Sequence, residues 1–368
     1  MIAANRSYWE EELYDVPYQL VVVGGGLVGQ SVAYFYKKEN PLARVLVVDR
    51  GFYPIGASTR NAGFACIGSV TEIMADLNIE DEDIVKERIH RRYEGLLLLR
   101  KELGDRHIDY DACGGWEIFT DREAFHEACK HIDQYNTWIY ELTGESDTYK
   151  AGEKLGKPVI FNRLEGALHS GKMMRALYEK NMSLGVEFRW ECSVNTVEDD
   201  GLIVLRNGIS IRAEQIVIST NAFTKTLLND IDITPGRGYI MLTNAGVNTE
   251  WYGTFHYDDG YIYFRNIGDD RLLLGGARNI DYEGEETSEF GVNEAIKERL
   301  IQFGNEVLGL PEGWGIEQEW SGIMGFTPSK SPILKRYNDR VLLATGLSGM
   351  GVALGMQLGK EAADLVRI

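Results

Sequence analysis

The feature that most constrains the fold of this chain is a glycine-rich turn near its N-terminus. The apolar stretch Tyr18–Val23 reads as a β-strand and runs directly into the turn Gly24-Gly25-Gly26-Leu27-Val28-Gly29. The segment from Leu27 to Tyr36 then reads as a helix, and Arg44 to Val48 reads as a second β-branched strand. This order predicts a βαβ unit with two parallel strands, and therefore an α/β fold.

The three glycines Gly24, Gly26 and Gly29 match the pattern G-x-G-x-x-G. The first permits a tight turn, the second lets the backbone approach a pyrophosphate, and the third lets the helix pack close to the strand. The anion is then expected on the helix N-terminus, at Leu27 and Val28, where the helix dipole also favours negative charge. The turn therefore predicts a dinucleotide site.

Asp49 strengthens this interpretation because it closes the second strand about 20 residues beyond the turn, where a carboxylate accepts hydrogen bonds from adenosine ribose hydroxyls. The same carboxylate would repel a 2′-phosphate, so NADP is disfavoured despite the neighbouring Arg50. We expect both Asp49 and Arg50 to border the cofactor. NAD and FAD share the pattern, so the choice between them must come from elsewhere in the chain.

The C-terminal segment favours a flavin. Val341 to Ala344 reads as a buried strand, and a turn rich in glycine leads from it into a closing helix over 352–366. Such a turn frees several N–H groups at the helix start, where they would stabilise the negative charge near N1 and O2 of a reduced flavin. A purely structural glycine turn is the alternative.

The order of motifs resembles, nearly end to end, the FAD-dependent amino-acid and amine oxidoreductases that include D-amino-acid oxidase, glycine oxidase and monomeric sarcosine oxidase. The motifs are the turn GGGLVG, the loop GASTRNAG at 56–63, the strand end ISTNA at 218–222, the piece PGRG at 235–238 and the C-terminal ATGLSGMG. The resemblance implies FAD, held in a glutathione-reductase-like domain that is interleaved with a substrate domain built on a mixed antiparallel sheet.

We expect the FAD-binding domain to comprise residues 17–80, 160–222 and 318–368, and the substrate domain to comprise 81–159 and 223–317. The resemblance also implies which residues border the cofactor, from its ring end to its adenine. These are Ser58, Thr59, Arg60, Asn61 and Gly63; Val194 at the adenine; Thr220 and Asn221; and Gly346, Ser348, Gly349, Met350 and Gly351 at the pyrimidine edge.

In that family a C–H bond beside an amine gives a hydride to flavin N5, water hydrolyses the resulting imine, and oxygen or another acceptor reoxidises the flavin. The expected substrate is a small amino acid or amine. Two alternatives stay open. One is oxidation of a 2-hydroxy acid or polyol phosphate, which needs a base such as His256 near N5. The other is a flavin-binding redox protein without turnover.

Substrate contacts are expected from the antiparallel segment, where Tyr261, Tyr263 and Arg265 share a strand face and His256 comes just before. A packed aromatic surface is the alternative for either tyrosine. Arg278 is the expected anchor for a substrate carboxylate, at a strand end where period 2 would place it with Leu272 and Leu274. Arg265 and Arg60 are the next candidates.

The composition excludes some partners. A formal net charge of −18 argues against nucleic acid. Met1 to Val16 has no basic-then-apolar pattern and no apolar run approaches about 20 residues, so we expect neither a signal peptide nor a transmembrane segment, and a cytoplasmic location. The four cysteines form no C-x-x-C pair, so we expect reduced thiols and no metal site.

We also expect the FAD to be non-covalent, because no histidine precedes His90 and no cysteine follows Cys192. Three further expectations concern local structure: strand over 107–120, one helix over Asp121–Leu142, and an amphipathic helix over 169–185. The apolar side of that last helix would comprise Met173, Met174, Leu177 and Met182.

Overall fold

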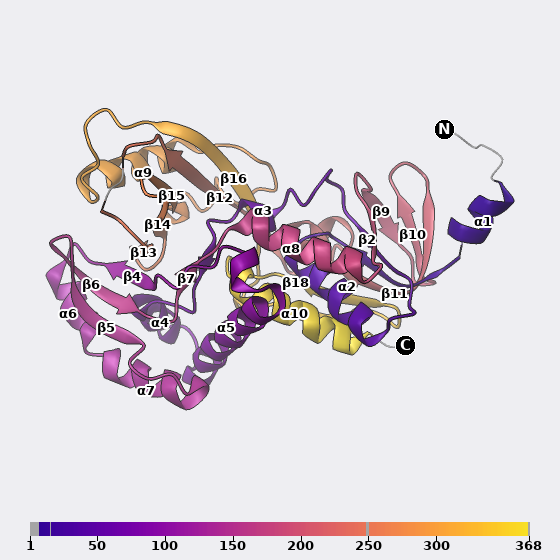
Figure 1. The fold of residues 1–368 in the computed structure, drawn as a ribbon, viewed down its shortest axis with the longest axis horizontal. Helices are drawn as coiled ribbons and strands as arrows, with labels where there is room; N and C mark the ends of the chain where they lie inside the picture. Colours follow the sequence, from indigo (N-terminus) through magenta and orange to yellow (C-terminus); the bar gives the residue numbers. More distant parts are fainter. Residues whose placement is uncertain (1–6, 15, 248–249, 367–368) are drawn as a thin grey trace.

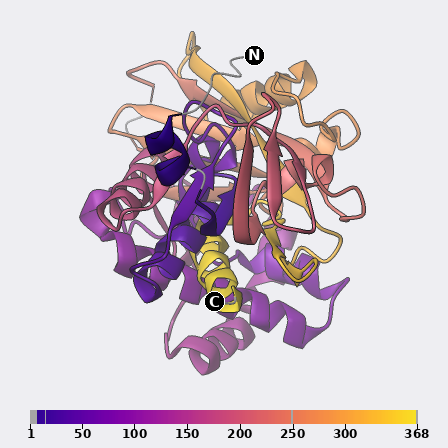
Figure 2. The same ribbon diagram turned by 90° about the vertical axis from the view of Figure 1, so that its right-hand side faces the viewer.

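The computed structural model of the chain describes residues 7–14, 16–247 and 250–366. Its strands sort into two large sheets that lie toward opposite ends of the long axis, with helices between and around them (Figure 1). Figure 2 shows the molecule turned by 90°. The hairpin of β9 (Val194–Val197) and β10 (Leu202–Leu205) and the C-terminal end of α10 (Gly351–Leu365) lie at the end that faces the viewer.

The first sheet contains the expected βαβ unit, because β1 pairs in parallel with β2 across the helix α2. Its other neighbour, β11, is parallel to β1 and to β18, while β17 closes the edge antiparallel to β18. In order, the strands are β17 (Ile333–Arg336), β18 (Val341–Thr345), β11 (Ser210–Ile218), β1 (Tyr18–Val23), β2 (Val45–Val48) and β8 (Glu187–Arg189); β9 (Val194–Val197) and β10 (Leu202–Leu205) extend from β11.

The second sheet is mixed, as expected, with antiparallel neighbours throughout except for the parallel pair β13 and β4. In order, its strands are β16 (Ile316–Phe326), β12 (Thr234–Thr243), β15 (Arg271–Gly276), β14 (Ile262–Ile267), β13 (Thr254–Tyr257), β4 (Gly115–Ile118), β6 (Lys157–Asn162) and β5 (Tyr149–Lys154). A small separate sheet pairs β3 (Phe64–Ala65) with β7 (Gly166–Ala167). The domain boundaries given above stay a prediction.

The helices surround the two sheets. They are α1 (Tyr8–Tyr14), α2 (Leu27–Glu39), α3 (Ala57–Arg60), α4 (Val70–Leu77), α5 (Glu82–Leu103), α6 (Arg122–Cys129), α7 (Ile132–Thr143), α8 (Ser170–Ser183), α9 (Glu294–Glu306) and α10 (Gly351–Leu365), with 3₁₀ turns η1 (Asp105–His107), η2 (Asn221–Thr226) and η3 (Arg278–Ile280). α10 packs against both α2 and α5, which fixes the loop between β18 and α10.

Three local expectations are wrong in part. Only Gly115–Ile118 of the segment 107–120 is a strand, because residues such as Asp109 adopt positive φ angles that extended chain excludes. The predicted helix over 121–142 is two helices, since Lys130 and His131 bond three residues back instead of four. Met182 is 48% exposed, whereas Met173, Met174 and Leu177 are buried.

Within the described ranges, no helix is long and apolar enough to cross a membrane. All four cysteines are free thiols. The same ranges bring together no group of three or more His, Cys, Asp or Glu side chains that could hold a metal ion.

Candidate active site

The turn between β1 and α2 is tight. Gly24 has a φ of +110°, and a Cβ on it would lie 2.6 Å from the carbonyl oxygen of Ser219. A Cβ on Gly29 would lie only 1.9 Å from the carbonyl oxygen of Gly24, so α2 can approach the strand because that side chain is absent. A Cβ on Gly26 would meet Ser58 Oγ at 3.0 Å. The backbone at Gly24 and Gly29 therefore admits no larger residue without moving.

The start of α2 offers N–H groups to an anion. Ser58 Oγ accepts the N–H of Leu27 at 2.9 Å. The first N–H groups of a helix have no acceptor within the helix. After that of Leu27, the next such N–H group in α2 belongs to Val28. No acidic residue lies in the first turn, so the positive end of the helix dipole is not neutralised there. This geometry suits a pyrophosphate.

Asp49 lies at the end of β2, directly beside the turn. Its Oδ2 accepts the N–H of Gly25 at 2.7 Å, and its Oδ1 accepts a second backbone N–H at 2.8 Å. The neighbouring Arg50 stacks its guanidinium 3.5 Å from the centre of the Phe223 ring, and burial lowers the pKa of Arg50. Val194, the predicted adenine contact, begins β9 and is partly buried. Contacts of these residues with adenosine stay predictions.

The loop at 56–63 is held by hydrogen bonds within itself and by one to the helix α8. Thr59 Oγ1 donates to a backbone carbonyl at 2.5 Å. Asn61 Oδ1 accepts the N–H of Gly63 at 2.9 Å and the hydroxyl of Ser170, on α8, at 2.7 Å. Because Asn61 holds both the loop and α8, the segment is rigidly placed next to the glycine turn.

The loop between β18 and α10 is a second rigid segment. Gly346, Ser348 and Gly349 all have positive φ angles, of +76°, +46° and +89°. The N–H of Ser348 donates to the carbonyl of Gly325 at 3.0 Å, and its hydroxyl accepts the N–H of Thr327 at 3.2 Å. Met350 and Gly351 then begin α10. This loop is therefore pinned to the end of β16.

The end of β11 contributes a buried acceptor. Asn221 has a φ of +50°, and among the described residues its Oδ1 is buried without a hydrogen-bond partner. Thr220, the residue before it, places its hydroxyl 3.1 Å from that of Thr224. A buried acceptor without a donor is costly, so Asn221 fits a bound molecule that supplies one.

The two loops converge on β16. Trp320 Nε1 donates to the carbonyl of Arg60 at 3.0 Å, so this strand holds the 56–63 loop. Further along the strand, Met324 Sδ lies 3.9 Å from the position of a Cβ on Gly349, in the other loop. Alternation along a strand places Trp320, Gly322, Met324 and Phe326 on the same face. The sequence predicted no site residue on β16, although the alternation of its side chains could have indicated one face of a strand.

Tyr263 and Arg265 lie on the face of β14 that meets the 56–63 loop. Arg265 Nη1 donates to the carbonyls of Gly63 at 3.0 Å and Leu168 at 2.9 Å, so this guanidinium is engaged by backbone. The Tyr263 ring lies 5.5 Å from that of Phe64, and burial raises the pKa of Tyr263 to about 12. Both side chains connect the second sheet to the loop.

His256 and Tyr261 are placed differently from each other. His256 Nε2 lies 2.9 Å from Oε2 of the buried Glu165, and its ring packs against Phe64 at 5.4 Å. Tyr261 precedes β14, is 42% exposed, and meets the ring of Tyr282 at 6.3 Å.

The expected strand position of Arg278 is wrong. β15 ends at Gly276, Ala277 turns the chain with a left-handed φ of +57°, and Arg278 begins η3. Leu272 and Leu274 are buried in the core of the second sheet, so Arg278 does not share their face. Its guanidinium carbon lies instead 4.3 Å from the centre of the Phe326 ring, beside the loop convergence on β16.

These features define a class of protein. A glycine turn at the carboxyl end of β1, a carboxylate at the end of β2 and a second N–H-bearing loop before α10 fit an adenine dinucleotide that carries a flavin. The close backbone packing at Gly24 and Gly29 and the buried acceptor of Asn221 are compatible with such a ligand.

Comparison with known proteins identifies the family. The model of the family described as FAD dependent oxidoreductase matches residues 19–365. The chain belongs to this family of amino-acid and amine oxidoreductases, and its cofactor is FAD. Glycine oxidase from Bacillus licheniformis is 23% identical over 95% of this chain and 93% of that protein. D-amino acid dehydrogenase from Helicobacter pylori is 23% identical over 94% of each chain.

Solved structures share the fold. Iminodiacetate oxidase from Chelativorans sp. BNC1 superposes with a TM-score of 0.76 at 19% identity, over 94% of this chain and 95% of that one. Glycine oxidase from Geobacillus kaustophilus gives a TM-score of 0.74 at 18% identity, over 95% and 94% of the two chains. The α/β architecture expected from the sequence is thus confirmed.

Proposed function

We propose that this protein oxidises the C–N bond of a small amino acid and that Arg278 holds the carboxylate of that substrate. The observation that carries the proposal is a partly buried guanidinium without an anionic partner. Among the described residues, no carboxylate lies within 4.0 Å of Arg278, and its buried Nε has no acceptor. The chain carries 56 acidic residues against 38 basic ones, so an unpaired arginine here is not explained by a shortage of acids.

The surroundings of Arg278 suit a carboxylate in a dry site. The guanidinium lies between the rings of Phe326 and Tyr282, at 4.3 and 5.2 Å from their centres. Burial lowers the pKa of Arg278, although it stays far above neutrality because guanidinium groups remain charged in proteins. A substrate carboxylate would supply two acceptors to the paired N–H donors and remove the cost of burying them unpaired.

The roles of the chain are orientation and electrostatics. The bound flavin supplies the hydride acceptor, N5. Arg278 orients the substrate, and Tyr261 and Tyr282 border it. The N–H groups at the start of α10, in the 346–351 segment, would stabilise negative charge on the pyrimidine edge of the cofactor. Two relatives carry the names glycine oxidase and D-amino acid dehydrogenase, which supports an amino-acid substrate.

The experiment is an anaerobic titration of the flavin absorbance with a panel of amino acids, amines and 2-hydroxy acids. We expect bleaching by an amino acid, and Arg278→Ala should raise its dissociation constant by about one to three orders of magnitude while FAD stays bound. Arg278→Lys should recover only part of the affinity, because an ammonium cannot reproduce the paired donors.

Arg271→Ala is the matched control, because Arg271 begins β15, the strand that precedes Arg278, but its partly exposed side chain pairs with Glu317. An unchanged dissociation constant in Arg278→Ala would contradict the anchor and transfer the role to Arg60. Bleaching by amines that lack a carboxylate, and by no amino acid, would contradict the proposed substrate class. Bleaching by none of the panel would favour a redox protein without turnover.

A further inference from the structure

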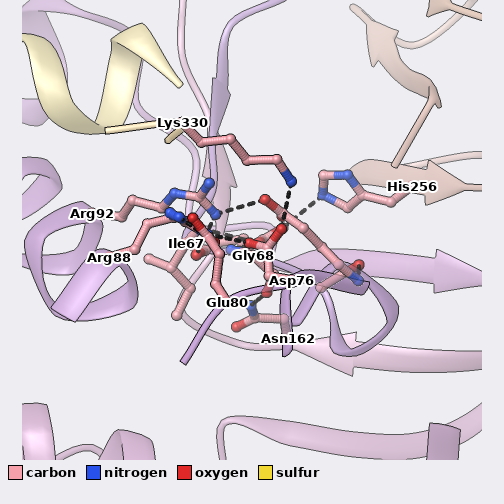
Figure 3. A network of polar contacts seen from close by, with 12 residues as sticks. Ile67, Gly68, Asp76, Glu80, Arg88, Arg92, Asn162, His256 and Lys330 are labelled. Atoms are coloured by element: carbon pink, nitrogen blue, oxygen red, sulfur yellow. Dashed lines mark hydrogen bonds and ion pairs between the residues drawn. The ribbon is translucent and has the colours of Figure 1, made fainter. Parts of the chain in front are cut away.

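Side chains bond both the N–H and the carbonyl of Ile67 and of Gly68, at the end of the segment that leaves the 56–63 loop. Glu165 Oε1 accepts the N–H groups of Ile67 at 3.2 Å and Gly68 at 3.3 Å. Arg92 donates to the carbonyl of Ile67 at 3.1 Å, and Tyr149 donates to that of Gly68 at 2.7 Å. Figure 3 shows Arg92 and His256 approaching this segment from opposite sides.

Glu165 and His256 form one unit with this segment. Glu165 lies directly before β7, whose residues pair with Phe64 and Ala65 in β3. Its other oxygen bonds His256 Nε2 at 2.9 Å, and the side chains of Glu165 and His256 are only 1% and 13% exposed. The His256 ring also packs on Phe64, the residue after Gly63. His256 therefore contacts the segment directly and through Glu165.

The site is built to hold a buried carboxylate. A Cβ on Gly115 would lie 2.0 Å from Glu165 Oε2, so the strand β4 makes room for that oxygen only with glycine. The groups that face His256 come from several elements around a cavity of about 10 Å³. Glu165, Glu117 on β4 and Tyr149 on β5 line this cavity together with His256. The charge of Glu72, on α4, also acts on His256, and Arg92, on α5, bonds Glu72.

These surroundings favour the charged imidazole. Burial lowers the pKa of His256, but the charge and hydrogen bond of Glu165, together with Glu117 and Glu72, outweigh burial and raise the pKa above its usual value. Burial raises the pKa of Glu117. His256 therefore keeps its proton to a higher pH than an imidazole in water does.

A second arm of the network begins at Arg88, one turn earlier on α5 than Arg92. Arg88 bonds Asp76 at 2.5 Å and donates to the carbonyl of Ser329 at 3.3 Å, and Lys330 bonds Asp76 at 2.5 Å (Figure 3). Ser329 and Lys330 follow Thr327, which bonds Ser348 in the loop before α10. This second arm joins α4 and α5 to the segment that follows β16, and it contains no histidine.

We propose that His256 is a positioning residue: in its charged form, paired with Glu165, it fixes Phe64–Gly68 and thereby the 56–63 loop in the geometry that binds the flavin. The proposal rests on the assignment of that loop to the flavin, and it does not depend on the substrate. FAD binds the loop in the geometry that the charged pair fixes, so FAD and the His256 proton favour each other's binding. The Arg88 arm, which contains no histidine, contacts the segment that is bonded to the other loop.

The sign of the pH dependence follows from linkage. A histidine whose pKa is raised in the ordered state contributes its stabilisation below its unperturbed pKa, near 6.5, and loses it as the pH rises through the raised value. FAD affinity should therefore be constant near pH 6 and fall at higher pH. Each unit by which FAD raises the pKa of His256 corresponds to about a tenfold change in affinity.

The test measures FAD affinity of the apoprotein by quenching of flavin fluorescence from pH 6 to pH 9, without substrate. We expect the dissociation constant of the wild type to rise about three- to tenfold over this range. His256→Gln keeps a hydrogen-bond donor for Glu165 but cannot ionise. The dissociation constant of FAD from this variant should therefore not vary with pH. Glu165→Gln should move the change to lower pH, because the imidazole loses its counter-charge.

His126→Gln is the control, since His126 is exposed on α6 and should keep the wild-type pH dependence. A pH-independent wild type, or a His256→Gln variant with the wild-type dependence, would overturn the proposal. If His256→Gln does not fold, the pKa of His256 is measured by NMR in the wild-type protein with and without FAD. Equal values in the two states would also overturn it. Loss of amino-acid turnover alone would leave these outcomes unaffected.

Discussion

Asp49 illustrates how much one residue contributes to the dinucleotide site. Its two carboxylate oxygens each accept a backbone N–H, one from the glycine turn at Gly25 and one from Gly51. Hydrogen bonds to an ionised acceptor are stronger than those between neutral groups. The residue therefore shapes the turn. Its predicted contact with a ribose can be tested by substitution.

We expect Asp49→Ala to weaken FAD binding by about 1–3 kcal/mol, or about 5- to 150-fold, because charge-assisted bonds to the ribose and the turn are lost. Asp49→Asn keeps one oxygen acceptor and should lie between the wild type and the alanine variant. The measurement is the dissociation constant of FAD from the apoprotein. An alanine variant with wild-type affinity would remove Asp49 from the site.

Single residues differ in how far the sequence predicts them. Gly24, Gly29 and Asp49 stand out in the sequence because the motif that contains them is local to one βαβ unit, although Ser219, far along the chain, also closes the space at Gly24. Arg278 was misplaced because Ala277 adopts a left-handed φ that its residue type does not announce. The partner of His256 was unpredictable for a different reason: Glu165 lies 91 residues away and meets it only in the folded chain.

At the scale of elements, α10 shows how glycines position a loop. A Cβ on Gly359 would lie 2.4 Å from Ser31 Cβ and 2.9 Å from the carbonyl of Val28 on α2. On the opposite side, a Cβ on Gly95 of α5 would lie 2.0 Å from the carbonyl of Ala353. α10 thus sits closely between two helices, and its first turn carries the loop at 346–351. The sequence predicted the helix but not these neighbours.

We expect Gly359→Ala to destabilise the protein by about 1–3 kcal/mol, because the new methyl group meets backbone of α2. Without that contact, alanine in a helix would stabilise by up to about 1 kcal/mol, so the sign of the change is itself informative. Thermal denaturation of the apoprotein measures it. Gly152→Ala is the control, since a Cβ there would meet nothing within 4 Å. Stabilisation by Gly359→Ala would contradict the close packing.

At the scale of the whole molecule, the two sheets draw strands from distant parts of the chain. β1 pairs with β2 nearby in sequence but also with β11, which in turn pairs with β18 near the C-terminus. The residue pattern indicated strands such as β1, β2 and β18 but missed β5 and β6. Beyond the parallel pair of β1 and β2, the sequence predicted no strand order, because strand pairing over such distances leaves no local signal. The contacts of β16 with the 56–63 loop and the 346–351 loop are visible only in the folded structure, where both loops meet one face of this strand.

The last prediction concerns how the whole molecule retains its cofactor. The purified protein should be yellow, with about one FAD per chain, and acid precipitation should leave the colour in the supernatant. Covalent attachment would need a nucleophile, and Cys66 is the cysteine closest in sequence to the 56–63 loop. Burial raises the pKa of the Cys66 thiol well above its usual value, so it stays protonated and unreactive.

Colour in the pellet would contradict this prediction, and Cys66→Ser would then decide whether Cys66 is the attachment point. A variant that releases its FAD would assign the bond to Cys66, and one that retains it would point to another residue. In the expected outcome, the absorbance and fluorescence of the wild-type supernatant identify free FAD.

Tight non-covalent binding must come from many contacts. Substitutions that disorder the 56–63 loop or the 346–351 loop should therefore also release FAD from the native protein.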